Sequence, residues 1–275
     1  MNNHNRTDAA HPPTALITGA SSGIGAALAQ AYAGQGWRLV LVGRRADALG
    51  ATAKACAQAQ GLQTVDPMRI RLITLDLLQT EAWREHAGAL VQGWGCPQVV
   101  IANAGISHGV DLARAEDLAV ARQVMDSNWL AALATLAPFI APMRARGNGT
   151  LVGVASVVGV RGLPGHAAYC ASKAALIHAL ESLRVELRDS GVRVVTISPG
   201  YVATPLTAGN PFPMPFLLQP DAFARRALRA IEAGRAYATI PWPMAVVSKL
   251  LHVLPRAWYD PIMAGQRRKP RKPKS

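Results

Sequence analysis

The stretch Ala15-Leu16-Ile17-Thr18-Gly19-Ala20-Ser21-Ser22-Gly23-Ile24-Gly25 decides the fold, because an apolar strand signal runs directly into a glycine-rich turn. A helical pattern, Ala26 to Ala33, follows at once. Gly19 permits a tight turn, Gly23 lets the backbone approach a pyrophosphate, and Gly25 allows close packing, while the helix N-terminus offers unsatisfied N–H groups to an anion. Glycine and serine also cluster in ordinary turns, so the flanking strand and helix supply the context that the motif requires. The stretch predicts a dinucleotide-binding loop.

Further strand signals alternate with helical stretches along the chain, which predicts an α/β fold with a parallel sheet covered on both faces. The strands are continuously apolar, as in Leu39-Val40-Leu41-Val42, and this is consistent with burial on both sides. The expected strands are Ala15–Thr18, Arg38–Val42, Arg69–Leu75, Val99–Asn103, Thr150–Ser156, Val192–Ser198 and Tyr237–Ile240.

The length of 275 residues, 50% of them hydrophobic, suffices for one sizeable core in a single domain. Residues 1–13 are polar, lack the apolar core of a signal peptide and are expected to form a disordered lead. The main domain is expected over 14–241, followed by an amphipathic segment and a basic tail over 242–275.

Tyr169 and Lys173 lie four residues apart on an expected helix, 166–190, so both side chains project from one helix face. The Lys173 ammonium is expected to lower the pKa of the Tyr169 phenol from about 10 toward working pH, where acid–base transfer is most efficient. Ser156 closes an expected strand and can hold the oxygen of a carbonyl or alcohol. Alone, the Tyr and Lys pair is ordinary helix composition; downstream of a dinucleotide loop, it indicates hydride transfer.

These motifs resemble the short-chain dehydrogenases/reductases, whose hallmarks are a Thr-Gly-x-x-x-Gly-x-Gly loop and a Ser, Tyr-x-x-x-Lys site. The resemblance covers residues 14 to 240 and implies a doubly wound, mostly parallel seven-stranded Rossmann sheet with helices on both faces. It implies that Tyr169 is the catalytic acid/base, that Ser156 orients the carbonyl, and that Lys173 perturbs Tyr169 and contacts a ribose. Asn128 matches the family's fourth catalytic residue, which holds a water that links the lysine to solvent.

The stretch Ala102-Asn103-Ala104-Gly105 resembles the family's Asn-Asn-Ala-Gly, with Ala102 in place of the first asparagine. This departure puts the tightness of the central turn in doubt but removes no catalytic group. Asp76 would accept from an adenine amino group. The cofactor contacts that the resemblance and the loop imply are Gly19, Ser21, Ser22, Gly23, Ile24, Gly25, Arg44, Arg45, Asp76, Leu77, Asn103, Ala104, Gly105, Tyr169, Lys173, Pro199, Gly200, Val202 and Thr204.

Arg44 and Arg45 follow the second expected strand, where sites for NAD commonly place an acidic residue. A bidentate, permanently charged guanidinium suits the 2′-phosphate that distinguishes NADP. NADP(H) is therefore predicted in preference to NAD(H). The alternative is that both arginines merely begin a solvated helix.

A proline-broken stretch, 201–220, carries apolar residues such as Leu206, Phe212 and Phe216, and in the resembled family this segment covers the substrate. An apolar lid excludes water and suits a hydrophobic ketone or secondary alcohol. The alternative, that these side chains pack against the protein's own helices, stays open. Only a catalytically silent dinucleotide-binding regulator or membrane scaffold competes with the oxidoreductase interpretation, and it has no chemical need for all four catalytic residues.

The expected helix Met244 to Leu254 is apolar around most of its surface, with Ser248, Lys249 and His252 as a narrow polar stripe. A tail with six cations in eight residues, 267–274, follows. The segment is too short to span a bilayer, so 244–275 either makes peripheral membrane contact or docks on the fold or a partner subunit, leaving a solvated tail.

The net charge of +13 falls to +7 without that tail, and aromatics make up only 5% of the chain, so no specific nucleic-acid binding is predicted. Cys56, Cys96 and Cys170 indicate neither a disulfide framework nor a metal site. A cytoplasmic location, with a possible place at the inner face of a membrane, is expected. The resemblance implies a homo-oligomer, either a dimer or a tetramer.

Overall fold

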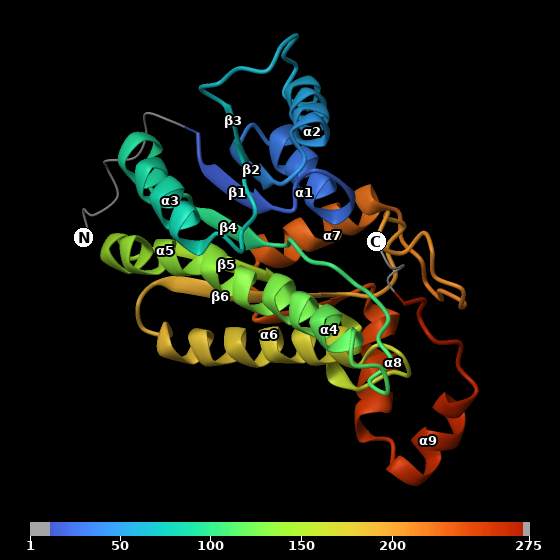
Figure 1. Cartoon of the computed structure of the whole chain (residues 1–275). Coiled ribbons are helices and arrows are strands. Elements are labelled where there is room, and N and C mark those ends of the chain that lie inside the picture. The colour runs from blue at the N-terminus through green and yellow to red at the C-terminus, as the bar shows by residue number, and fades with distance from the viewer. Residues whose placement is uncertain (1–11, 272–275) are drawn as a thin grey trace.

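A seven-stranded sheet forms the centre of the computed structural model, which describes residues 12–271 (Figure 1). The strand order is β3-β2-β1-β4-β5-β6-β7, and all six pairings are parallel, which confirms the doubly wound Rossmann sheet. Residues 1–11 of the expected disordered lead lie outside the described range. The strands are β1 Thr14–Thr18, β2 Arg38–Gly43, β3 Ile70–Thr74, β4 Val99–Ala102, β5 Gly149–Val154, β6 Val192–Pro199 and β7 Tyr237–Ile240.

Helices cover both faces of this sheet (Figure 1). One face carries α1 (Gly23–Gly34), α2 (Ala46–Ala59) and α7 (Pro220–Glu232). The opposite face carries α3 (Thr80–Trp94), α5 (Ala131–Arg146) and α6 (Ala167–Glu186). The remaining helical elements are α4 (Asp117–Met125), the π-helical turn η1 (Asp126–Leu130), the 3₁₀ turn η2 (Val157–Val160), α8 (Trp242–Val253) and α9 (Arg256–Ala264).

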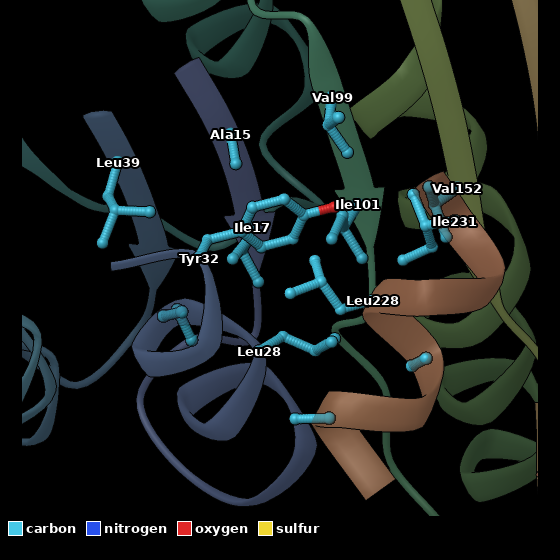
Figure 2. Packing of buried hydrophobic residues seen from close by; sticks show 14 of the residues in the cluster. Ala15, Ile17, Leu28, Tyr32, Leu39, Val99, Ile101, Val152, Leu228 and Ile231 are labelled. Carbon is cyan, nitrogen blue, oxygen red and sulfur yellow. The ribbon is translucent and has the colours of Figure 1, made fainter. Parts of the chain in front are cut away.

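The side chains of successive strand residues pack into two separate cores, because neighbouring side chains point to opposite faces of a sheet. Ala15 and Ile17 of β1 pack with Leu28 and Leu228 from α1 and α7 (Figure 2). Leu16, between them in sequence, belongs to the other core. Burial on both faces explains why the middle of β1 is apolar at consecutive positions.

The helical run Asp117–Arg146, through α4, η1 and α5, is long and apolar enough to cross a membrane by length and composition. Its α5 part instead packs on α3 and on β4 and β5, with Phe139 and Met143 fully buried. We interpret the run as a core helix of this fold.

The C-terminal region differs from expectation in two places. Ser248 is buried against the domain and donates to the Met244 carbonyl at 2.8 Å, so it does not belong to an exposed polar stripe. The solvated tail of the docking alternative is only partly correct where it is described, because Arg267 and Arg268 are exposed whereas Lys269 is half-buried and Arg271 bonds to Asp117. The tail residues from 272 to 274 lie outside the described part.

Candidate functional site

A cavity of about 380 Å³ lies where the carboxyl ends of β1, β4, β5 and β6 meet their following loops. This edge of a doubly wound sheet is where the strand order reverses and where ligands bind. All of the predicted site residues line it except Gly25 and Asn128, which lie directly behind its wall. The lining residues are Gly19, Ser21, Ser22, Gly23, Ile24, Arg44, Arg45, Asp76, Leu77, Asn103, Ala104, Gly105, Ser156, Tyr169, Lys173, Pro199, Gly200, Val202 and Thr204.

The glycine loop joins β1 to α1 in a conformation that side chains would block. Gly19 and Gly23 have φ values of 65° and 57°, in the left-handed region that favours glycine. A Cβ on Gly25 would lie 2.3 Å from the Gly19 carbonyl oxygen, so only glycine lets α1 approach the turn this closely. The first turn of α1 therefore presents its backbone N–H groups at the cavity.

Asn103 and Thr18 anchor the glycine loop to the end of β4. The Asn103 amide donates to the Thr18 carbonyl at 2.9 Å, and the Thr18 hydroxyl accepts from the backbone N–H of Asn103 at 3.1 Å and of Ala104 at 3.2 Å. Ala102 is buried within β4, and the anchoring contacts start one residue later. The missing first asparagine therefore leaves the anchor of the glycine loop in place.

Two guanidiniums stand at the end of β2. Arg45 donates to the hydroxyls of Ser22 at 3.0 Å and Ser21 at 3.3 Å. Arg44 pairs with Asp76 at 3.6 Å, and the Arg44 side chain is 59% exposed. Positive charge thus borders the glycine loop on its β2 side.

Ser156, Tyr169 and Lys173 converge beyond the end of β5. Lys173 donates from Nζ to the Val154 carbonyl at 2.8 Å, and its Nζ lies 6.0 Å from the centre of the Tyr169 ring. The Ser156 hydroxyl is hydrogen-bonded to the Tyr169 phenol. Three groups from a strand end and one helix face are therefore brought together as the spacing predicts.

The expected fall in the pKa of Tyr169 is wrong for this structure. Burial disfavours the phenolate and raises the pKa to about 12, and the hydrogen bond with Ser156 offsets only part of this. The Lys173 ammonium is itself poorly solvated, because burial lowers its pKa to about 8, and its Nζ lies over the Tyr169 ring. Tyr169 is consequently a protonated hydroxyl, suited to donating a proton.

Asn128 sits on the π-helical turn η1, a distortion that is frequent at functional sites. Its Oδ1 accepts from Ile106 N at 2.8 Å, and its Nδ2 donates to Ile106 O and to Ser172 Oγ, each at 2.9 Å. The side chain therefore ties the loop after β4 to α6. Ser172, between Tyr169 and Lys173, is a member of this network that the sequence motif did not reveal.

The far end of the cavity is apolar and was only partly foreseen. Leu163, His166, Tyr201 and Phe212 line it, and burial lowers the pKa of His166 below its usual value. Lys269, from the C-terminal region, also lines this end. No local signal identifies Lys269, because its place depends on contacts with residues more than a hundred positions earlier.

The sequence model of the short chain dehydrogenase family matches residues 13–211. The chain belongs to this family. It is 43% identical over 247 residues to a Myxococcus xanthus protein named as an uncharacterized oxidoreductase, covering 90% of this chain and 94% of the other.

Two solved structures share the fold. An alcohol dehydrogenase from Thermococcus sibiricus, complexed with 5-hydroxy-NADP, has a TM-score of 0.71 at 27% identity, covering 84% of this chain and 96% of the other. L-Sorbose reductase from Gluconobacter frateurii, complexed with NADPH and L-sorbose, has a TM-score of 0.72 at 25% identity, covering 83% and 93%. This short-chain dehydrogenase is therefore an oxidoreductase that uses a nucleotide cofactor on alcohol or carbonyl groups.

The residues present fit such a cofactor. The glycine loop forms a cradle that a single Cβ would fill, and its N–H groups suit a pyrophosphate. Asp76 and Arg44 flank the space on one side, and Thr204 contacts the loop at Gly23 on the other. Backbone approach, charge and hydrogen-bonding groups are thus all available at one end of the cavity.

Proposed function

We propose that the protein interconverts a secondary alcohol and a ketone with NADP(H), and that it binds a hydrophobic substrate at the apolar end of its cavity. The observation that carries this proposal is the convergence of Ser156, Tyr169 and Lys173 in the same cavity as the glycine loop. A regulator without chemistry has no need for a desolvated lysine beside a half-buried phenol at the cavity wall.

When bound, the nicotinamide supplies the hydride in reduction and accepts it in oxidation. In reduction, the Tyr169 hydroxyl donates its proton to the substrate oxygen, and the Ser156 hydroxyl donates a hydrogen bond that fixes this oxygen. The high pKa of Tyr169 keeps its proton available at neutral pH. The Lys173 ammonium stabilises the phenolate that remains, and Asn128 keeps α6 and the loop after β4 in register.

Arg45 supports the preference for NADP(H). Its guanidinium reaches the hydroxyls of Ser21 and Ser22, so it stands over the loop that would hold the phosphates. Arg44 adds a second charge at the same strand end and is neutralised only by an exposed contact with Asp76. A 2′-phosphate would find two donors here, whereas the 2′-hydroxyl of NAD would find no carboxylate on β2.

A second cavity of about 330 Å³, which adjoins the first, supports a hydrophobic substrate. The two share Leu163, His166, Tyr201 and Phe212, and the second extends to Leu251 on α8. We infer that an apolar substrate chain extends from the catalytic groups past these shared residues toward α8. Segment 201–220, the expected lid, contributes walls to both cavities.

The test is NADPH oxidation across a panel of aliphatic, acyl and steroidal ketones, comparing the intact protein with Tyr169→Phe. We expect turnover that is lost in the variant while NADPH binding is retained. NADPH binding without turnover of any ketone would favour the regulator. Turnover that survives Tyr169→Phe would contradict the proposed role of Tyr169.

Peripheral membrane contact is a second proposal, favoured by exposed apolar side chains on α8 and α9. Trp242, Leu250, Val253 and Trp258 are each more than 60% exposed. We expect the full chain to co-sediment with anionic vesicles and a Trp242→Ser, Leu250→Ser, Val253→Ser variant to remain in solution. Equal sedimentation of both would exclude the exposed face of α8 as the contact.

A homo-oligomer is also proposed, since α4, η1 and α6 expose Leu118, Leu130 and Val185 on the same side of the sheet. Light scattering on the eluted protein measures the subunit number. A monomer at working concentration would contradict this proposal. The cytoplasmic location stays a prediction.

A further inference from the structure

Residues Arg267–Arg271, which we call the C-terminal strap, cross the apolar end of the cavity. The Gly109 N–H donates to the Pro270 carbonyl at 3.1 Å, and Arg267 donates to the Pro211 carbonyl at 3.3 Å. A Cβ on Gly109 would lie 2.2 Å from the Lys269 carbonyl oxygen. The backbone of the strap thus packs so closely on Gly109 that a side chain at position 109 would not fit.

A charged anchor holds the end of the strap. Arg271 donates to both oxygens of Asp117, at 2.6 and 2.7 Å, and Asp117 is 3% exposed. These hydrogen bonds lower the pKa of Asp117 to about 2, so the carboxylate stays charged at every ordinary pH. Asp117 also accepts a hydrogen bond from the Asp111 N–H at 2.7 Å, which fixes the loop that carries Gly109.

Lys269 lies between these attachment points and turns inward. It is half-buried and lines the cavity, whereas the preceding Arg268 is exposed. Burial lowers the pKa of Lys269, and its positive charge contributes to the lowered pKa of His166, which lies three residues before Tyr169. The ammonium is therefore at the substrate end, on the opposite side of the cavity from the arginines that follow β2.

Within the described range 12–271, no carboxylate forms an ion pair with Lys269. A partly desolvated charge without a counter-charge is unfavourable, and the strap nonetheless holds it at the cavity wall. An anion bound in the cavity would offset this cost. The surrounding side chains, Leu163 and Phe212 among them, leave room for an apolar chain beside it.

We propose that Lys269 binds an anionic group on the substrate, so that the substrates are amphipathic keto acids and the corresponding hydroxy acids. This assignment rests on the proposed function and narrows it. The carboxylate pairs with Lys269, the carbonyl lies at Ser156 and Tyr169, and the remaining chain occupies the apolar space.

The test is calorimetric titration of the full chain, saturated with NADP⁺, with γ-, δ- and ε-keto fatty acids and the methyl ester of each. Lys269→Met removes the charge at nearly constant length, and Lys269→Arg keeps it. Arg268→Met is the matched control, because it removes a charge from the exposed neighbouring position. Thermal unfolding of each variant verifies that the fold is retained.

We expect at least one acid to bind about tenfold more tightly than its ester, as a charge-assisted hydrogen bond provides. Lys269→Met should remove that difference by weakening the acid alone, while Lys269→Arg and Arg268→Met preserve it. The assignment is overturned if no acid is preferred over its ester, if Lys269→Met weakens acid and ester equally, or if Arg268→Met has the same effect.

NADPH oxidation with the same acids separates this assignment from the proposed function. An acid that binds through Lys269 but is never reduced would contradict the oxidoreductase activity on such compounds and leave the anion site standing. Reduction of neutral ketones with no preference for acids would support the oxidoreductase activity and contradict the anion site at Lys269.

Discussion

Replacing Gly25 by alanine tests how tightly the cofactor loop is packed. The added Cβ would lie 2.3 Å from the Gly19 carbonyl oxygen and 2.6 Å from Asn103 Nδ2. Carbon–oxygen contacts are normally about 3.3 Å or longer, so α1 must withdraw from the turn by about 1 Å. The first neighbour is backbone, which cannot rotate away as a side chain can.

The structure sets the size of the effect. Overpacking of this kind costs about 1–3 kcal/mol, and disturbing the buried bond from Asn103 to Thr18 adds about 1 kcal/mol. The better helix propensity of alanine returns about 0.5–1 kcal/mol. The expected net loss is about 1–3.5 kcal/mol, a fall in Tm of roughly 2–14 °C for a domain of this size.

Thermal unfolding and equilibrium NADPH titration measure the two consequences of Gly25→Ala. The control is Gly50→Ala, in the middle of α2, where an added Cβ meets nothing within 4 Å. That variant should gain about 0.5–1 kcal/mol and bind NADPH unchanged. Gly25→Ala should lose stability and at least tenfold in NADPH affinity, because its helix N-terminus moves. The reasoning is refuted if both variants melt and bind alike.

Three further outcomes are expected. Lys173 has a folded pKa of about 8 against 10.5 for the free side chain, so the unfolded chain binds more protons between these values and stability should rise by about 2–3 kcal/mol from pH 8 to pH 10.5. Denaturant unfolding at both pH values should show this rise in the wild type and not in Lys173→Met. Arg45→Asp and, more weakly, Arg44→Asp should lower the NADPH to NADH ratio of kcat/KM, by about tenfold or more for Arg45, and an unchanged ratio in both would contradict the NADP preference. Trp83→Phe should cost about 1–3 kcal/mol in denaturant unfolding, because the Ala134 carbonyl loses its 2.9 Å donor inside the core, and a cost near zero would mean that this bond contributes nothing.

Strand positions could be predicted from the sequence because each strand is a short apolar run with a sharp end. Tyr237–Ile240 matches the observed β7, and the other strands differ by at most two residues at an end. The expected helix 166–190 ends earlier, at Glu186, before the turn that leads into β6. Such errors fall where hydrogen bonding, rather than hydrophobicity, sets the boundary.

The convergence of Ser156, Tyr169 and Lys173 could also be predicted, because a strand end and one turn of helix fix where side chains point. Their protonation could not. The pKa of Tyr169 depends on how completely neighbouring elements exclude water, and the sequence spacing carries only the proximity of a cation. The attachment of the strap to the domain could not be predicted for a similar reason: Asp117 and Arg271 are 154 residues apart and neither carries a local signal.

The two ends of the cavity therefore differ in how far a sequence can describe them. At the cofactor end, one continuous loop supplies the turn, the helix N-terminus and the close backbone approach, so eight consecutive residues, 18–25, reveal the ligand class. At the substrate end, the walls come from four separate segments of the chain, which contribute Ile106, Leu163, Tyr201 with Phe212, and Lys269. Each of these is ordinary in its own surroundings, and together they make an apolar space with one ammonium. The substrate class can therefore be inferred only from the folded structure, which brings these residues together. Of these residues, Lys269 is the one whose role can be tested by removing a charge.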